Sequence, residues 1–145
     1  RPIVVVISDP SLATQSNEVQ FVLNPNWRDG MGSSIRAGLN QNSAAAVVLL
    51  LCDQPLVSAH FLNRLASTGS PLAAAEYNGT IGVPAFFSSK YFEELKNLKG
   101  GAKEILLRRR TEVEAIPCPE AAFDVDTPED LLRLAQEQQA AQAQQ

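Results

Sequence analysis

The chain has 145 residues, of which 45% are hydrophobic and 19% charged, and its net charge is −4 at pH 7. This length and composition are typical of one globular domain with a core of its own. An acidic balance without a basic block argues against nucleic acid or an anionic membrane surface as a partner, and no apolar run approaches the roughly 20 residues of a membrane span. The two cysteines form neither a disulfide framework nor a metal-binding pattern, which favours a cytoplasmic location.

The first half of the chain alternates predicted strands with loops and a helix. β-Branched residues predict a buried strand over 3–7, and a shorter strand is predicted over 19–23. A loop with two glycines and two hydroxyls, residues 27–34, leads into a helix from Ser34 to about Asn40. The apolar run at 46–52 predicts a strand buried on both faces, as in a parallel sheet that helices cover.

Asp53 follows that apolar run, and Pro55 cannot donate to a sheet ladder, so the strand is expected to end near Asp53. Asp53 is therefore predicted at the carboxyl end of a central strand, where α/β sheets bind ligands. A carboxylate there suits a divalent metal, and a metal there suits phosphate chemistry. An Asp after a strand also commonly hydrogen-bonds the following turn, so a structural role is an open alternative. Cys52 is interpreted as a small core residue.

A helix and a hairpin are predicted next. Ser58 is a plausible N-cap for the helix that follows it. Residues 72–77 predict a strand, Asn78-Gly79 is a hairpin-turn signal, and residues 82–87 return as the second strand. Pro84 in this return predicts an edge or irregular position.

The last part of the chain predicts helices around one short strand. Helices are expected from the serines at 88–89 to about residue 98 and over 102–109, with a strand near 113–116. Thr127-Pro128-Glu129-Asp130 is a strong helix start, and the tail over 136–145, rich in Gln and Ala, extends that helix or frays. The alternation predicts an α/β fold of three layers, with a mainly parallel, Rossmann-like sheet and the β-hairpin as an antiparallel excursion.

Several motifs stand in order along almost the whole chain. They are Asn24…Trp27…Gly30-Met31…Ser34-Ile35…Gly38-Leu39, Leu51-Cys52-Asp53-Gln54-Pro55, the Gly82-x-Pro84 turn and Asp124-Val125-Asp126-Thr127-Pro128-Glu129-Asp130. Together they resemble the MobA-like nucleotidyltransferases, and most of all the molybdenum cofactor cytidylyltransferase branch. The resemblance implies a nucleotide-diphospho-sugar-transferase-like fold.

The resemblance also implies a reaction, in which CMP moves from CTP to a phosphorylated acceptor, molybdopterin in the most similar branch, with Mg²⁺ bound to the nucleotide. Asp53 matches the family's metal-binding and catalytic Asp. Asp126 matches the second acidic position and is preferred over its neighbour Asp124. Stabilisation of the last helix's dipole is the structural reading of Asp126, and both roles are compatible.

Gly30, Gly32 and Ser34 match the segment that contacts the nucleotide base and ribose in the family. Backbone approaches a ligand closely at Gly, and a Ser hydroxyl offers a donor and an acceptor to a base edge. The alternative is a plain loop that caps the next helix through Ser33 or Ser34.

Other positions carry weaker expectations. Gly82 begins a turn that continues with His in the family, and Val83 stands here instead, which weakens an acceptor-side role for Gly82. Trp27 is expected to be a core or lid residue. His60 is expected on a surface helix without a catalytic role.

The family opens with a strand and a glycine-rich loop that carries Arg and Lys for the triphosphate, and this sequence has no such segment. We therefore expect residues 1–145 to form a single nucleotidyltransferase-like domain without that first strand, with weak triphosphate binding and little or no activity of the chain alone. The strands at 3–7 and 46–52 are then expected to pair directly or to leave exposed edges prone to self-association. A guanylyl- or sugar-nucleotide transferase, and a non-catalytic nucleotide-binding remnant, are the alternative functions.

Overall fold

The computed structural model describes residues 2–41 and 43–144, and its strands form two sheets. The smaller is a parallel pair, and the larger is four-stranded with the order β3-β5-β4-β6. The strands are β1 (Ile3–Ile7), β2 (Val19–Leu23), β3 (Ala46–Leu49), β4 (Leu72–Tyr77), β5 (Thr80–Ser88) and β6 (Glu114–Pro117). In the larger sheet β4 and β6 are parallel, and β5 runs antiparallel to both of its neighbours.

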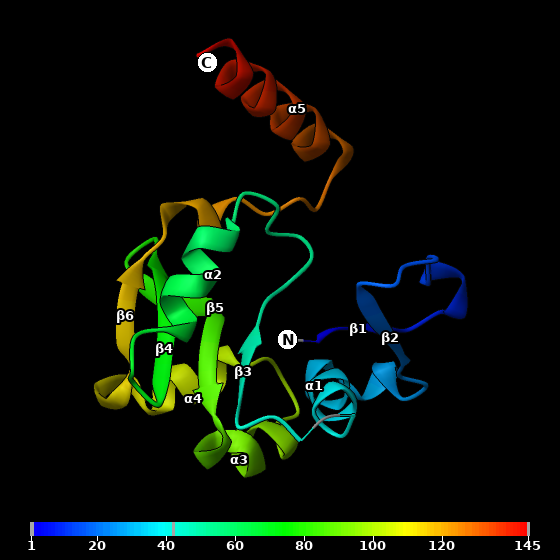
Figure 1. Cartoon of the computed structure of the whole chain (residues 1–145), viewed down its shortest axis with the longest axis vertical. Coiled ribbons are helices and arrows are strands. Elements are labelled where there is room, and N and C mark those ends of the chain that lie inside the picture. The colour runs from blue at the N-terminus through cyan, green and yellow to red at the C-terminus, as the bar shows by residue number, and fades with distance from the viewer. Residues whose placement is uncertain (1, 42, 145) are drawn as a thin grey trace.

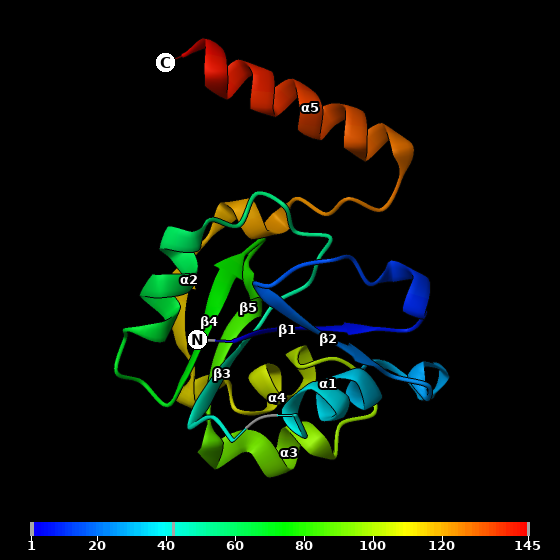
Figure 2. The ribbon, with the colours of Figure 1, turned by 45° about the vertical axis from the view of Figure 1, so that its right-hand side comes forward.

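Helices cover both faces of the four-stranded sheet (Figure 2). They are α1 (Met31–Leu39), α2 (Ala59–Ala66), α3 (Phe92–Lys96), α4 (Lys103–Arg108) and α5 (Pro128–Ala143), with 3-10 turns η1 (Pro10–Leu12), η2 (Trp27–Asp29), η3 (Ser89–Tyr91), η4 (Arg110–Glu112) and η5 (Pro119–Ala122). Along β4, Leu72 and Ala74 join the core with α3 and α4, whereas Ala73 and Ala75 join the core with α2. Alternate side chains of a strand point to opposite faces, so the predicted three layers are confirmed.

α1 connects the two sheets, which do not hydrogen-bond to each other within residues 2–41 and 43–144. Its Ile35 and Leu39 pack against the core that contains α3 and α4. Its Gly38 lies against β1, because an added Cβ would be 3.1 Å from a methyl group of Val6. The strands at 3–7 and 46–49 therefore leave an unpaired edge each, which is the second of the two arrangements expected from the sequence.

β3 differs from the predicted strand, which was to be buried on both faces of a parallel sheet. It ends at Leu49, lies at the sheet edge and pairs antiparallel with β5. Leu50 is 51% exposed and Cys52 is also exposed, so the interpretation of Cys52 as a core residue is wrong. The apolar run predicts a strand, but burial of the strand also requires a neighbour on each side. β1 is likewise less buried than predicted, with Ile3 59% exposed.

The predicted hairpin is confirmed, but Pro84 does not lie in an edge strand. Asn78 and Gly79 have φ of 51° and 70°, the left-handed values that a tight hairpin turn requires. β5 lies between β3 and β4, and its register with β4 shifts between Ala74 and Ala75. Pro84 falls in this irregular stretch, where a missing N–H does not break a regular ladder.

Two helix starts agree with the predicted caps. The Ser58 hydroxyl accepts a hydrogen bond from the Phe61 N–H at 3.1 Å and so begins α2. Thr127 and Asp130 form a reciprocal capping box at the start of α5, in which each side chain accepts from the other residue's backbone N–H.

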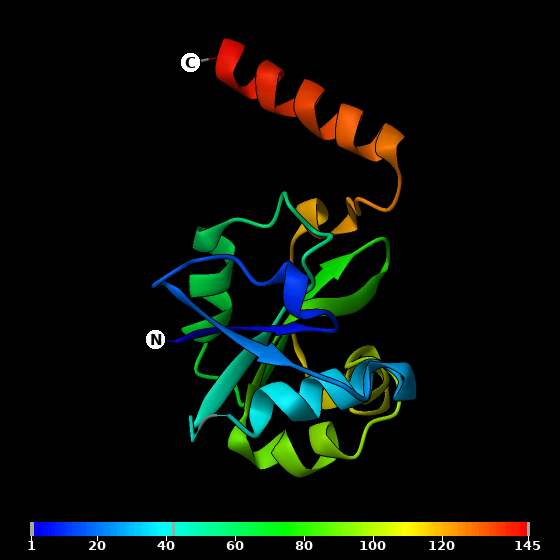
Figure 3. The ribbon, with the colours of Figure 1, turned by 90° about the vertical axis from the view of Figure 1, so that its right-hand side faces the viewer.

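α5 stands away from the rest of the molecule in views at right angles to each other (Figures 1 and 3). The Gln/Ala-rich tail extends this helix to Ala143. Leu131 and Leu132 of this helix are 57% and 66% exposed. Among the described residues, no helix combines the length and the apolar character needed to cross a membrane.

Candidate functional site

Asp53 lies half-buried in the turn that follows β3. Its backbone oxygen accepts a hydrogen bond from the Val125 N–H at 2.8 Å, which holds the segment after η5 alongside this turn. Its side-chain Oδ1 is buried and has no hydrogen-bond partner in the described part of the chain. A buried carboxylate oxygen without a partner is costly, and a cation at this position would compensate it.

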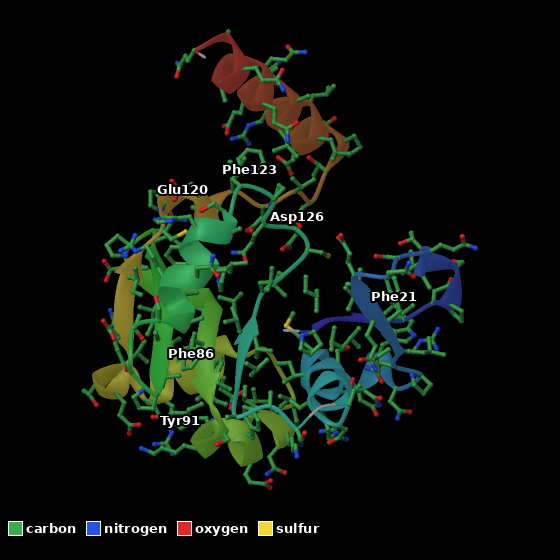
Figure 4. All side chains as sticks on the ribbon, viewed as in Figure 1. Phe21, Phe86, Tyr91, Glu120, Phe123 and Asp126 are labelled. Carbon is green, nitrogen blue, oxygen red and sulfur yellow. The ribbon has the colours of Figure 1, made fainter. Side chains whose placement is uncertain are left out.

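Two more carboxylates flank the Val125 contact. Asp124 precedes Val125 and Asp126 follows it. Figure 4 shows Asp126 on the segment that leads to α5. Partial burial and the nearby carboxylates of Asp53, Asp126 and Asp130 raise the pKa of the Asp124 side chain. The structure therefore brings Asp53 together with the 124–126 segment. The negative charge of Asp53 acts on Asp124, although the sequence motif favoured Asp126 over Asp124 as the second metal ligand.

Tyr77 is a polar residue near this cluster that the sequence reasoning did not identify. Its hydroxyl donates to the backbone oxygen of Val83 at 3.2 Å. Burial raises the pKa of Tyr77, and the carboxylates of Asp124 and Asp53 raise it further, whereas the neighbouring amide of Gln54 lowers it. No motif around Tyr77 marks it, because its position depends on the folding of the hairpin.

Gly82 lies within β5, whereas the sequence placed it at a turn. A Cβ added at Gly82 would be 2.6 Å from the Tyr77 hydroxyl oxygen. The lack of a side chain at Gly82 is therefore needed for the close approach of Tyr77. An acceptor-side role for Gly82 stays a prediction.

The segment that holds Gly30, Gly32 and Ser34 is largely helical, because α1 begins three residues earlier than predicted. Gly30 occupies the N-cap position with φ of 105° and no side chain caps the helix, so the alternative in which Ser33 or Ser34 caps it is wrong. A Cβ added at Gly30 would be 2.5 Å from the backbone oxygen of Lys99, and one added at Gly32 would be 1.8 Å from the backbone oxygen of Leu98. Packing within the chain thus accounts for both glycines, and their contact with a nucleotide stays a prediction.

The two serines of this segment have different hydrogen bonds. The buried Asn24 donates through Nδ2 to Ser33 Oγ at 2.9 Å and to Ser34 Oγ at 3.0 Å. The Ser33 hydroxyl donates onward to the backbone oxygens of Gly30 and Asn26. The half-buried Ser34 hydroxyl has no acceptor among residues 2–41 and 43–144, so its proton is available to a ligand.

Trp27 and His60 lie outside this cluster. Trp27 is 44% exposed on η2, with the Arg28 guanidinium 4.6 Å from the ring centre, so it is not a core residue. His60 is exposed on α2, as predicted.

The carboxylates fit a cation that arrives with its substrate. No group of three or more His, Cys, Asp or Glu side chains suited to a metal ion occurs in the part of the chain that the structure describes. Mg²⁺ commonly takes one or two carboxylates and completes its shell with water and substrate phosphate oxygens. Asp53, with its unpartnered Oδ1, and one carboxylate of the 124–126 segment match this pattern.

Comparisons of the sequence point to one family. The model of the MobA-like NTP transferase domain matches residues 1–114. The chain is 35% identical to the purine catabolism protein PucB of Bacillus subtilis (strain 168), in an alignment that covers 73% of this chain and 57% of PucB. The chain therefore spans little more than half the length of this curated relative.

Solved structures share the fold. The structure of Rv0371C from Mycobacterium tuberculosis H37Rv in complex with manganese superposes with a TM-score of 0.69 at 26% identity, covering 92% of this chain and 76% of that chain. Molybdopterin-guanine dinucleotide biosynthesis protein A from Archaeoglobus fulgidus superposes with a TM-score of 0.60 at 18% identity, covering 90% and 75%, and shows the fold alone. The predicted α/β, nucleotide-diphospho-sugar-transferase-like fold class is confirmed.

Proposed function

This chain belongs to the MobA-like NTP transferase family, and from that premise we propose that it transfers CMP from CTP to a phosphorylated acceptor, molybdopterin. The observation that carries the proposal is the unpartnered, buried Oδ1 of Asp53 beside the carboxylates at 124–126. The family supports nucleotidyl transfer, and the manganese complex of the mycobacterial relative supports a divalent cation.

In the proposed reaction an oxygen of the acceptor phosphate forms a bond to the α-phosphorus of CTP. The bond from that phosphorus to the oxygen that bridges to the β-phosphate breaks, and pyrophosphate leaves with the electron pair. A bound Mg²⁺ would neutralise charge on the triphosphate. Asp53 and Asp126 would hold this ion, and the backbone bond between Asp53 and Val125 keeps the two segments at a fixed separation.

We assign the nucleotide base to the start of α1, through Ser34. The Ser34 hydroxyl keeps a free proton, because Asn24 donates to its oxygen and no described acceptor takes its hydrogen. Cytosine presents a ring nitrogen and a carbonyl that accept such a proton, next to an exocyclic amine. Guanine is larger and has a different donor pattern, so a short segment with one free hydroxyl favours CTP.

Transfer of GMP from GTP is the second candidate. The name of the archaeal neighbour, a molybdopterin-guanine dinucleotide biosynthesis protein, favours it for that protein. A pocket that hydrogen-bonds its ligand discriminates strongly, because the wrong base leaves buried polar groups unpaired at about 1–3 kcal/mol each. The two candidates are therefore separable by affinity.

The test is a pair of calorimetric titrations, CTP and GTP with Mg²⁺, on the wild type and on Ser34→Ala. Removal of one hydrogen bond worth about 1.4 kcal/mol should weaken CTP binding about tenfold and GTP binding less. Ser89→Ala, at an exposed serine of η3, is the matched control and should leave both affinities unchanged. Equal affinities for the two nucleotides, or no effect of Ser34→Ala, would contradict the assignment of the base site.

A further inference from the structure

Gln54 is a buried polar residue next to the candidate metal ligand, and it is 6% exposed. Its Nε2 donates to two backbone oxygens, that of Ala121 at 2.9 Å and that of Val83 at 3.1 Å. These three residues belong to the turn after β3, to η5 and to β5 respectively. One side chain therefore ties together three segments that lie far apart in the sequence.

Each of the three segments leads to part of the candidate site. Gln54 itself follows Asp53 in the chain. Ala121 lies three residues before Asp124, in the stretch that continues into the 124–126 segment. Val83 also accepts the Tyr77 hydroxyl at 3.2 Å, and Tyr77 lies in the electrostatic field of the same carboxylates.

The Gln54 amide has a fixed orientation, and only its nitrogen makes hydrogen bonds. Because both carbonyls accept from Nε2, the orientation of the amide is fixed, and Oε1 is buried without a hydrogen-bond partner among the described residues. An unpaired buried oxygen opposes stability, whereas the two Nε2 bonds satisfy backbone carbonyls that an apolar side chain would leave without this donor. Because these bonds join η5 and β5 to the turn that carries Asp53, they also fix how far η5 lies from that turn.

We propose that Gln54 is a positioning residue for the cation site: it sets the separation between the Asp53 carboxylate and the carboxylates of the 124–126 segment. The inference rests on the proposed function, since it requires that Asp53 holds a divalent cation. Gln54 acts through Ala121 and Val83 and does not touch the cation. Groups that orient metal ligands in this way typically contribute ten- to a hundredfold to metal affinity.

The test measures Mn²⁺ binding by electron paramagnetic resonance, in the presence of CTP, on wild type and Gln54→Met. Loss of both N–H donors of the amide should weaken Mn²⁺ binding at least tenfold and broaden the spectrum of the Mn²⁺ that stays bound. Tyr91→Phe is the control, because it removes a buried hydroxyl that donates to Glu112 at 2.9 Å, in the network of η3 and η4. This control should leave Mn²⁺ affinity unchanged, which separates a local effect on the site from general loss of stability.

A second variant keeps the inference testable if Gln54→Met does not fold. Gln54→Asn retains an amide but is one methylene shorter, so it cannot reach both carbonyls, and its Mn²⁺ affinity should also fall. Hydrogen exchange should then accelerate at the Val125 N–H, whose bond to Asp53 depends on the same separation.

The outcomes also separate this inference from the proposed function. If wild type binds Mn²⁺ and Asp53→Asn does not, the cation site stands. Unchanged Mn²⁺ affinity in Gln54→Met and Gln54→Asn would then overturn the role of Gln54 alone. If wild type itself does not bind Mn²⁺ with CTP, the proposed function and the positioning role both fail.

Discussion

At the scale of single residues, Asp53 has two oxygen groups with different surroundings. Its backbone oxygen is engaged by Val125, whereas its side-chain Oδ1 is buried without a partner among the described residues. A purely structural Asp in a turn would use its side chain for local hydrogen bonds. The backbone contact carries the structural role here, which leaves the carboxylate for a ligand.

Asp53→Asn should therefore lower the rate of nucleotidyl transfer at least about a hundredfold, because the amide binds a divalent cation poorly. The melting temperature should stay the same or rise, since one of several neighbouring negative charges is removed. Transfer is followed as pyrophosphate release, and unfolding by circular dichroism. Loss of the fold together with activity would identify a structural Asp.

Asp124 predicts a pH dependence of stability. Its pKa in the folded protein is raised by burial and by Asp53, so the charged form is disfavoured by folding. The penalty is present at neutral pH and disappears as pH falls below the ordinary Asp pKa of about 3.9. Asp124→Asn should thus raise the unfolding free energy at pH 7 by at most about 0.5 kcal/mol, because the side chain is only partly desolvated and solvent screens its charge, and the gain should vanish near pH 3. Denaturant titrations at both pH values check this, and a gain that persists at pH 3 would be inconsistent with it.

The sequence predicted the roles of single residues well where the structure depends only on residues nearby in the chain. Ser58, Thr127 and Asn78-Gly79 have the caps and the turn expected of them, since their partners lie within three residues. The start of α1 was missed because Gly30 and Gly32 meet the carbonyl of Lys99, which is distant in sequence.

At the scale of elements, burial was harder to predict than element type. β3 was predicted as a central strand from its apolar run but lies at the sheet edge, because strand order decides which strand is covered. Pro84 lies in a central strand, in the irregular stretch that was one of its two predicted positions. In the site, family motifs indicated Asp53 and the 124–126 segment. Gln54 and Tyr77 were not assigned roles, since their contacts arise only when the hairpin and η5 meet the turn.

The caps of α5 and α2 predict different responses to the same kind of mutation. Thr127→Ala should destabilise the first turn of α5 by about 1 kcal/mol and speed hydrogen exchange within α5. The melting temperature should change little, because α5 stands apart from the rest of the molecule. Ser58→Ala should lower the melting temperature, because α2 buries Phe61 and Leu65. Hydrogen exchange measured by mass spectrometry, together with thermal unfolding, distinguishes the effects of the two mutations. A large loss of melting temperature in Thr127→Ala would mean that α5 packs on the body.

At the scale of the whole molecule, β1 is an outer strand of the smaller sheet and β3 is an outer strand of the larger one. Within residues 2–41 and 43–144 these two strands do not pair with each other, and α1 is the element that joins the sheets. Such edges template association with other chains.

The chain should consequently self-associate as its concentration rises, as sedimentation velocity would report. Charges placed at an exposed residue of β1 and at the exposed residue that follows β3, Ile3→Lys with Leu50→Lys, should suppress association. Leu107→Lys, at an exposed leucine of α4, is the control and should not. A wild type that stays monomeric at all concentrations would contradict this.

CMP transfer is measured most directly with CTP labelled at the α-phosphate, Mg²⁺ and molybdopterin. Label should move to the pterin in step with pyrophosphate release, slowly in this chain, faster with CTP than with equal GTP, and not at all in Asp53→Asn. Transfer that proceeds equally well with GTP, or that survives Asp53→Asn, would contradict the assignment. Binding of CTP without any transfer would instead identify a nucleotide-binding protein without this chemistry.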